Sequence, residues 1–330
     1  MAATSTVALA PAGGRRRRPS FEAAWGWFFL LPYVVVFLLF VAYPIAYGAW
    51  LGSNPAGYAR LLGDPIYWRT VQNTLVFLLV GVNLKMLVAL GLSGFFVLPY
   101  TWVRVVGVLF ILPWAVPHIP SILSIRWFLN SEWGMLNNLI WQAFGVFGPS
   151  WLSDTRYAFG CVIAVHIWKY LPFWTLILVA GRLAIPKDLY EAARIDGASS
   201  WQLFRFVTFP QIRNLFITST VLTTIWSLGD FNSVYLLTGG GPAERTNTLA
   251  TLGIRYAFRE ADIGSGVAAM ITGLPLLIPL VVFLIRRLGR RPRRSPAWPA
   301  GSPTTASWRC SRRWCCSGRF CRSTTWWCCR

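Results

Sequence analysis

Long apolar runs separated by short polar segments dominate the chain, in which 55% of the residues are hydrophobic and 13% are charged. A helix crosses a bilayer with about 20 consecutive apolar residues. Six runs reach this length, covering 26–47, 71–97, 104–125, 158–181, 214–237 and 264–285. The second run contains Lys85, and the third is interrupted by Pro113, Pro117 and Pro120. The pattern predicts an all-α membrane protein with about six transmembrane helices, the first of them an anchor because no small-residue cleavage site follows it.

One polar insert, residues 182–213, separates the fourth run from the fifth. Pro186 suits the first turn of a helix that ends near Ile195, and Gly197 follows where a positive φ is expected. Ser199 or Ser200 can cap a second short helix, which Pro210 is expected to stop. The insert is therefore either a compact helix–turn–helix for a partner or an ordinary amphipathic connector.

The formal net charge of +20 is concentrated at the two ends of the chain. Arg15–Arg18 contribute 4 of the 31 basic residues and the segment 286–330 contributes 12, which leaves 15 basic and 11 acidic residues between them. This distribution argues against a nucleic-acid-binding face. Arginines flank the first and last runs, which is the positive-inside pattern. It predicts a cytoplasmic N-terminal segment at 1–24 and places the 182–213 insert in the cytoplasm.

Several polar side chains fall inside the apolar runs, where they usually face the protein interior or a pathway. Asp230, Asn232 and Tyr235 are candidate substrate-pathway residues, the alternative being a hydrogen bond between helices or an interfacial position. His166 is expected to have a packing role. Lys85 has no evident partner in the sequence.

Signatures of catalysis are missing from the sequence. The glycine-rich stretch at 239–246 lacks the lysine of a phosphate-binding loop, so the chain is not expected to hydrolyse ATP. No HExxH motif and no paired Cys/His spacing occurs before the tail. Cys161 is expected to pack as a small apolar side chain. We therefore expect no catalytic residue, metal or cofactor.

Three motifs occur in the central and C-terminal parts of the chain. One consists of Glu191-Ala192-Ala193, Asp196-Gly197-Ala198, Phe204 and the pair Phe209-Pro210. It resembles the EAA loop of ABC importer permeases, with Phe209 as a mild departure from the usual leucine. The other two are IWKYLPFWTLILVAGRLAIP at 167–186 and GDFNSVYLLTGGGPAERTNTLAT at 229–251, and they resemble the maltose and glycerol-phosphate type of these binding-protein-dependent permeases. The resemblance runs from about Trp25 to Arg287. The segment after the first run is shorter than is usual in the family.

The resemblance implies a permease domain at 25–288 in a bacterial or archaeal inner membrane, importing a sugar or polyol. Its expected partners are a second permease, two ATP-binding subunits that hydrolyse ATP, and an external solute-binding protein. The EAA-like loop at 182–213 would contact the ATPase through the following matched positions: Glu191, Ala192, Ala193, Asp196, Gly197, Ala198, Phe204 and Pro210. The alternatives are an ion-coupled secondary transporter and a degraded, non-transporting membrane protein.

The tail at 289–330 has a different composition from the rest of the chain. Six of the seven cysteines lie in its last 21 residues, without zinc-site spacing and without histidine. Cys and Trp codons both begin with TG, so a frame that starts one base earlier reads each of them as Leu, Met or Val. The shifted frame would encode an apolar segment similar to the first span of a partner permease. We therefore interpret the tail as frameshifted and non-functional.

Ending the chain after Arg294 is expected to preserve or improve expression and to leave assembly with the ATPase intact. The truncation removes cysteines prone to oxidation and keeps the arginines that fix orientation. Co-purification of the ATPase with the truncated chain measures assembly. Sequencing the coding DNA is a second check, because stop codons in the shifted frame would contradict the interpretation.

Overall fold

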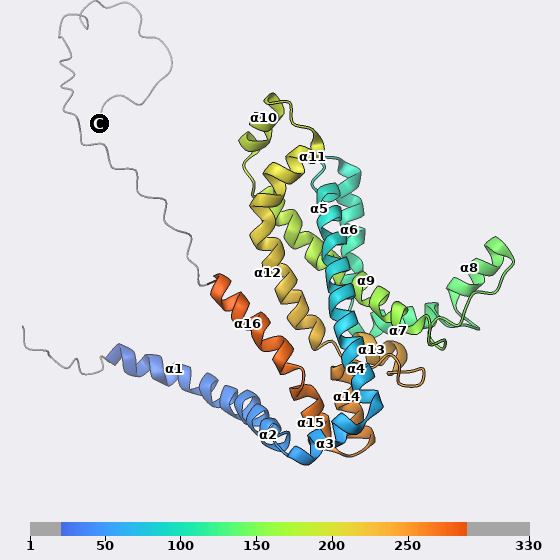
Figure 1. Ribbon diagram of the computed structural model, residues 1–330. Coiled ribbons are helices and arrows are strands. Elements are labelled where there is room, and N and C mark those ends of the chain that lie inside the picture. Colours follow the sequence, from blue (N-terminus) through green and yellow to red (C-terminus); the bar gives the residue numbers. More distant parts are fainter. Residues whose placement is uncertain (1–20, 289–330) are drawn as a thin grey trace, which may run out of the picture. The chain divides into compact units, whose positions relative to one another are not determined.

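The computed structural model describes the backbone of residues 21–288, with side chains from 25 to 286. Most of the basic segment 1–24 and the tail 289–330 lie outside the described residues. The described part is helical, without strands, and Figure 1 shows its elements. This confirms the all-α fold class.

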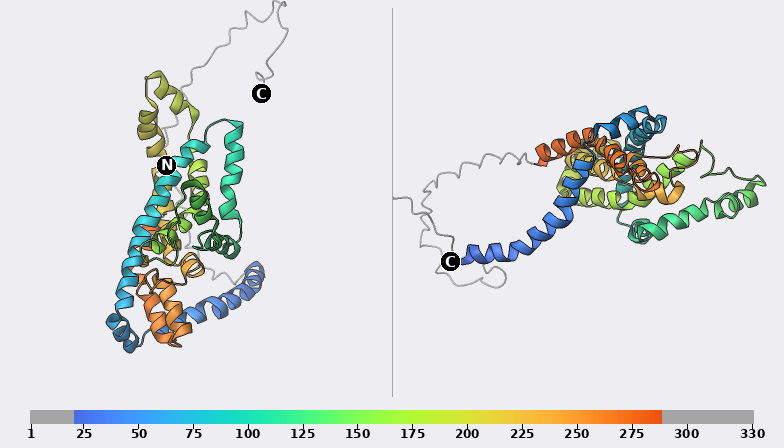
Figure 2. Two further views of the ribbon diagram at one scale, coloured as in Figure 1. Left: turned by 90° about the vertical axis from the view of Figure 1, so that its right-hand side faces the viewer. Right: turned by 90° about the horizontal axis from the view of Figure 1, so that it is seen from below.

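The first predicted span is one continuous helix made of α1 (Phe21–Phe37), a π-helical turn η1 (Leu38–Ala42) and α2 (Tyr43–Leu51). Its apolar window from Trp25 to Leu51 has no buried residue. α1 projects from the helix bundle in Figure 2, and only α2 packs against α15 (Ile263–Ile271). Lipid or another chain must cover a surface this apolar.

The second predicted span begins after α3 (Pro55–Gly63). It consists of α4 (Pro65–Val76), η2 (Phe77–Val82) and α5 (Asn83–Phe96). Asp64 caps α4 by accepting a hydrogen bond of 2.8 Å from the Ile66 amide. Pro65 then occupies the first turn, where its missing N–H costs nothing. These 32 residues form one long apolar helix.

The third predicted span is broken. α6 (Thr101–Ala115) and α7 (His118–Phe128) meet at an angle of 99°. Pro117 lies between them, and a residue before proline is pushed out of the helical region. Val116 accordingly has φ −67° and ψ 140°. A separate short helix, α8 (Met135–Phe144), contacts α7.

The centre of the bundle is α9 (Ala158–Leu183), which matches the fourth predicted span. It packs along α5, α6 and α12 (Phe209–Leu228), and Figures 1 and 2 show these helices side by side. Their shared core includes Phe77, Met86, Trp174, Leu178 and Ile212, all nearly inaccessible. Because burial of apolar area drives packing, α9 is the helix on which the others depend.

The predicted run 214–237 is not one helix, which corrects the fifth expected span. α12 ends at Leu228, and a separate helix α13 (Asn232–Thr238) begins four residues later. Gly229 and Asp230 occupy the break, where the Asp230 carboxylate accepts a 3.1 Å hydrogen bond from the Ser233 amide. An Asp that caps the following helix in this way favours a new helix over continuation of the old one.

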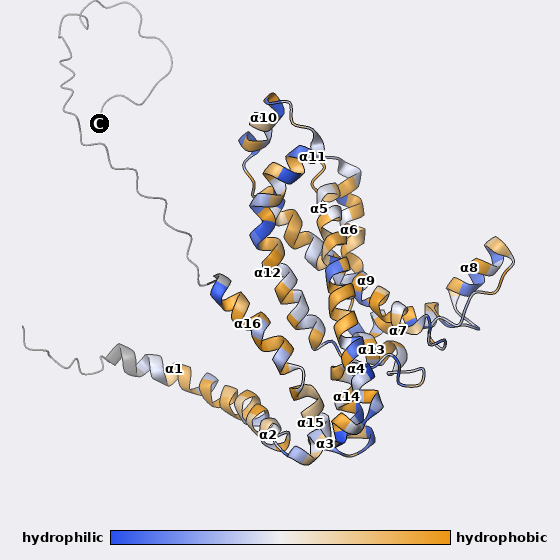
Figure 3. Cartoon of the chain, in the orientation of Figure 1, coloured by the Kyte–Doolittle hydropathy of each residue, from blue (hydrophilic) through white to orange (hydrophobic). Residues whose placement is uncertain are grey.

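The last part of the chain contains α14 (Leu249–Ile254), η4 (Arg255–Arg259), α15 and α16 (Leu274–Leu288). α14 and α15 approach closely: a Cβ at Gly266 would lie 2.6 Å from the Gly253 carbonyl oxygen. α15 and α16 are bent by 40°. Apolar residues dominate α1, α5, α6 and α16 in Figure 3, whereas α10 (Lys187–Ile195) carries polar ones.

Six spans are not confirmed. Among the described residues, three helices are long and apolar enough to cross a membrane, and the count rises to five if each bent pair is one span. α12 is long enough, with 20 residues, but its first turns hold Gln211, Arg213 and Asn214, and Ser and Thr recur later.

Replacing Thr74 by Val should destabilise the fold by about 1–3 kcal/mol, because it leaves a buried backbone donor unpaired. The Thr74 hydroxyl donates a hydrogen bond to the Thr70 carbonyl. It also accepts one of 3.0 Å from the amide of Leu249, which is the first residue of α14. Thr220→Val is the control, since that hydroxyl bonds only to Phe216 in its own helix. Thermal unfolding in detergent measures both variants, and equal midpoints would contradict the prediction.

Candidate functional site

The 182–213 insert folds as the predicted helix–turn–helix at one end of the bundle (Figure 1). α10 ends with two hydrogen bonds, from the Gly197 amide to Arg194 (3.0 Å) and from the Ala198 amide to Ala193 (3.0 Å). This is a Schellman cap, which requires a left-handed residue. Gly197 supplies it with φ +78°, as the sequence predicted.

The second helix of the insert begins with α11 (Ser200–Gln202). Ser199 and Gln202 form a reciprocal capping box, which confirms Ser199 as the cap. The expectation that Pro210 stops this helix is wrong. The chain continues through a π-helical turn, η3 (Leu203–Thr208), directly into α12. A proline ring clashes with the helical turn that precedes it. Here the preceding turn is the wider π-helical one, and the Thr208 hydroxyl donates a hydrogen bond of 3.3 Å to the Leu203 carbonyl.

Side chains on the inner face attach the insert to the bundle. The Tyr190 and Thr208 hydroxyls are 3.0 Å apart and link α10 to η3. Phe204 packs against the main core, with the Arg182 guanidinium 5.5 Å from its ring centre. Phe204 therefore anchors the insert. Ala193 and Ala198, which precede it in the insert, are half-buried.

The outer face of the insert is exposed and mixed in character. Glu191, Ala192, Asp196, Gly197 and Pro210 are all exposed. Large apolar side chains that the sequence analysis did not single out accompany them: Ile195 (86% exposed), Trp201 (67%) and Phe206 (69%). Their signal was present in the sequence as apolar residues inside a polar insert, which is typical of an interaction surface.

The three candidate pathway residues lie in two environments. Asp230 is buried, whereas Asn232 and Tyr235 share the exposed face of α13. Val234 and Leu237 form the opposite, buried face, where α13 packs on α7 and α9. Tyr235 stacks on Phe231 with ring centres 4.5 Å apart.

A chain of buried polar groups connects three helices. The Lys85 Nζ on α5 lies 3.0 Å from His166 Nε2 on α9, and His166 Nδ1 lies 2.7 Å from the Asp230 carboxylate. The Ser227 hydroxyl is also 3.1 Å from His166 Nε2. The sequence analysis gave Lys85 no partner, because 81 residues separate it from His166.

A second buried lysine compensates the break between α6 and α7. Lys169 Nζ on α9 donates to the carbonyls of Pro113 (2.6 Å) and Val116 (2.7 Å). A helix that ends leaves carbonyls without an internal donor, and a lysine near that end can satisfy them.

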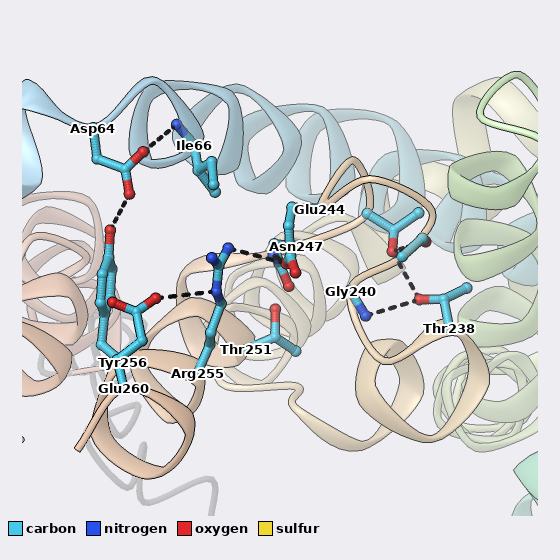
Figure 4. A network of polar contacts seen from close by, with 12 residues as sticks. Asp64, Ile66, Thr238, Gly240, Glu244, Asn247, Thr251, Arg255, Tyr256 and Glu260 are labelled. Carbon is cyan, nitrogen blue, oxygen red and sulfur yellow. Dashed lines mark hydrogen bonds and ion pairs between the residues drawn. The ribbon is translucent and has the colours of Figure 1, made fainter. Parts of the chain in front are cut away.

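At the opposite end of the bundle from α10, a polar network holds the glycine-rich segment (Figure 4). Arg255 pairs with Glu244 (3.2 Å) and Glu260 (3.3 Å), and Tyr256 donates to Asp64. Burial and the hydrogen bond to Asp64 raise the pKa of Tyr256 above its usual value. The ion pair of Glu244 with Arg255 thus ties the glycine-rich segment to η4.

A cleft of about 490 Å³ opens beside this segment. Its polar lining comes from the end of α7, the loops near 131 and 153, and the end of α13; it includes Arg126, Asn130, Glu132, Ser153 and Thr238. Among the described residues, no group of three or more His, Cys, Asp or Glu side chains could hold a metal ion.

Comparison with known proteins identifies the family. The model of the family "Binding-protein-dependent transport system inner membrane component" matches residues 87–294. The chain is 31% identical over 278 residues to the trehalose/maltose transport system permease protein MalF of Thermococcus litoralis, covering 80% of this chain and 94% of that protein. It is 30% identical over 274 residues to the sulfoquinovosyl glycerol transport system permease protein SmoG of Agrobacterium fabrum, covering 78% and 89%.

The fold agrees with this assignment. A chain in the crystal structure of a bacterial alginate ABC transporter, in complex with an alginate pentasaccharide-bound periplasmic protein, superimposes with a TM-score of 0.73. The match has 23% sequence identity and covers 84% of this chain and 99% of that chain. The chain described here belongs to the family of inner membrane components of binding-protein-dependent transport systems.

Proposed function

We propose that this chain is a transmembrane subunit of an ATP-driven importer for a sugar or related polyol. The relatives' names support this solute class: two are permeases for trehalose/maltose and for sulfoquinovosyl glycerol, and a third is the lactose permease LacF of Rhizobium radiobacter. Family membership favours ATP-driven import over the alternative of an ion-coupled secondary transporter. ATP hydrolysis is assigned to a separate subunit.

The observation that carries the proposal is the exposed outer face of the 182–213 insert. Ile195, Trp201 and Phe206 expose large apolar side chains on the insert, which also carries the exposed residues Glu191 and Asp196. Large exposed apolar side chains among polar and charged ones are typical of a protein-binding site. We assign this face to the ATPase subunit, which places the insert in the cytoplasm.

The same orientation makes α12 a membrane crossing, the fifth in chain order, and brings the proposed total to six. Its hydroxyls bond to carbonyls of the preceding turn, as with Thr220 to Phe216 (2.8 Å) and Thr224 to Thr220 (2.7 Å), so they need no outside partner. Six crossings keep the arginine-rich segments before α1 and after α16 on the cytoplasmic side.

Family membership supports the remaining partners that we propose. Lipid covers the apolar face of α1, a second permease completes the pathway, and a second ATP-binding subunit serves that permease. The external solute-binding protein would approach the end with the 490 Å³ cleft. Asn232 and Tyr235 are the solute contacts that we assign to the pathway. Asp230 is buried in this structure, so we assign it a supporting position behind the pathway and no contact with the solute.

Replacing Gly197 by Asp should abolish solute-stimulated ATP hydrolysis while the chain still inserts into the membrane. Asp tolerates a positive φ better than most residues, so the change tests the docking surface more than the backbone. It adds a side chain and a charge where the partner fits. Gly197→Asn is the matched control, because it adds the same volume without charge and should retain more activity. Wild-type stimulation in a reconstituted Gly197→Asp complex would contradict the assignment.

Replacing Asn232 by Ala should weaken uptake by up to about tenfold, the loss expected from one neutral hydrogen bond. Membrane vesicles containing the complete transporter are assayed with radiolabelled maltose, trehalose and lactose. Asn138→Ala is the control, because this exposed asparagine lies on α8, away from the proposed contacts. Equal uptake by the two variants, with any solute that the wild type transports, would remove Asn232 from the pathway.

A further inference from the structure

Three ionisable side chains meet inside the bundle, each from a different element. Lys85 lies on α5, His166 on α9 and Asp230 in the break between α12 and α13. Their exposed fractions are 1%, 1% and 7%. A charged group buried among apolar helices is costly unless it is compensated, so these three residues have to be explained together.

The geometry defines how the compensation works. His166 Nδ1 is 2.7 Å from a carboxylate oxygen of Asp230, which can only accept, so Nδ1 carries the hydrogen. His166 Nε2 is 3.0 Å from Lys85 Nζ, which can only donate when charged, so Nε2 accepts. With Lys85 charged, a neutral imidazole bridges a cation and an anion. The Tyr170 ring also faces Lys85, with its centre 5.4 Å from Nζ.

The Asp230 end of this bridge controls the backbone that follows. Its second oxygen accepts from the Ser233 amide (3.1 Å), at the start of α13. The orientation of α13 decides which side chains face outward, and those are Asn232 and Tyr235. A carboxylate held on one side by His166 and on the other by Ser233 fixes the place where α13 begins.

We infer that Lys85 and His166 are positioning residues that act through Asp230 to hold the break between α12 and α13 and so set the exposed face of α13. Neither residue reaches that face. The inference concerns the bridge itself, and it rests on the proposed function only for the idea that the exposed face of α13 contacts solute.

The chain offers a matched control in Lys169. It is also a buried lysine, 2% exposed, on a helix of the same core. Its Nζ donates to backbone carbonyls of Pro113 and Val116 and not to His166 or Asp230. Loss of either lysine removes a buried charge, but the two losses should loosen different breaks.

Backbone hydrogen exchange, followed by mass spectrometry on the complete purified transporter, shows which segment each lysine variant destabilises. Lys85→Met should speed exchange at 229–238, including the Ser233 amide, by about tenfold or more, as expected for one lost hydrogen bond to a charged group. It should leave 113–121 unchanged. Lys169→Met should do the reverse. Faster exchange of both segments in both variants, or no change at 229–238 in Lys85→Met, overturns the inference.

A double-variant cycle tests whether the two charges depend on each other. Removal of one partner of a buried pair leaves the other uncompensated, whereas removal of both is better tolerated. Lys85→Met should lower the unfolding midpoint of the full-length chain by roughly 5–10 °C. Adding Asp230→Asn should recover at least half of that loss. In the Lys169→Met background the same second change should bring no recovery, and additive losses in both backgrounds would overturn the inference.

The outcomes separate this inference from the proposed function, because neither measurement uses a solute. Localised exchange and recovery in the double variant support the bridge even if Asn232→Ala transports normally, and that result would remove only the pathway assignment. Impaired uptake by Asn232→Ala, together with additive losses in the cycle, would keep the pathway and overturn the bridge.

Discussion

The helix bundle depends on donors that satisfy backbone carbonyls where a helix breaks among apolar neighbours. An unsatisfied carbonyl in such surroundings costs several kcal/mol, and the 99° bend after α6 frees carbonyls at Pro113 and Val116. Lys169 reaches both from α9, the central helix. The bend directs α7 toward α13, which packs on it. One lysine thus supports an arrangement that extends from α6 to the candidate pathway face.

The sequence was sufficient for features that are local. The helix end at Gly197 and the cap at Ser199 follow from residue types within a few positions: the sequence predicts the first and limits the second to Ser199 or Ser200. Apolar runs identified a membrane protein because hydropathy needs no knowledge of packing. The same local reasoning was wrong at Pro210, since a widened π-helical turn before a proline depends on how η3 packs against α10.

Features that depend on three-dimensional packing could not be predicted. Lys85, His166 and Asp230 are separated by 81 and 64 residues, and their contact requires three helices with correct relative rotation. The sequence also could not show that Asp230 is buried while Asn232 is exposed, because both residues lie in the same apolar run. Hydropathy measures the mean environment of a window and does not detect a break inside it, which is why 214–237 was read as one helix.

The proposed ATPase-binding face of the 182–213 insert and the proposed solute-contact face of α13 are connected by one helical segment. From Ser200 the chain is helical through η3 and α12 to Leu228, and the break with Asp230 follows immediately. α12 has 20 residues and is therefore about 30 Å long. A helix transmits displacement along its axis with little loss, since compression would break its hydrogen bonds. A movement imposed on α11 therefore reaches the α12–α13 break without passing through a loop. Whatever holds that break, rather than the helix itself, then determines how much of the movement reaches α13.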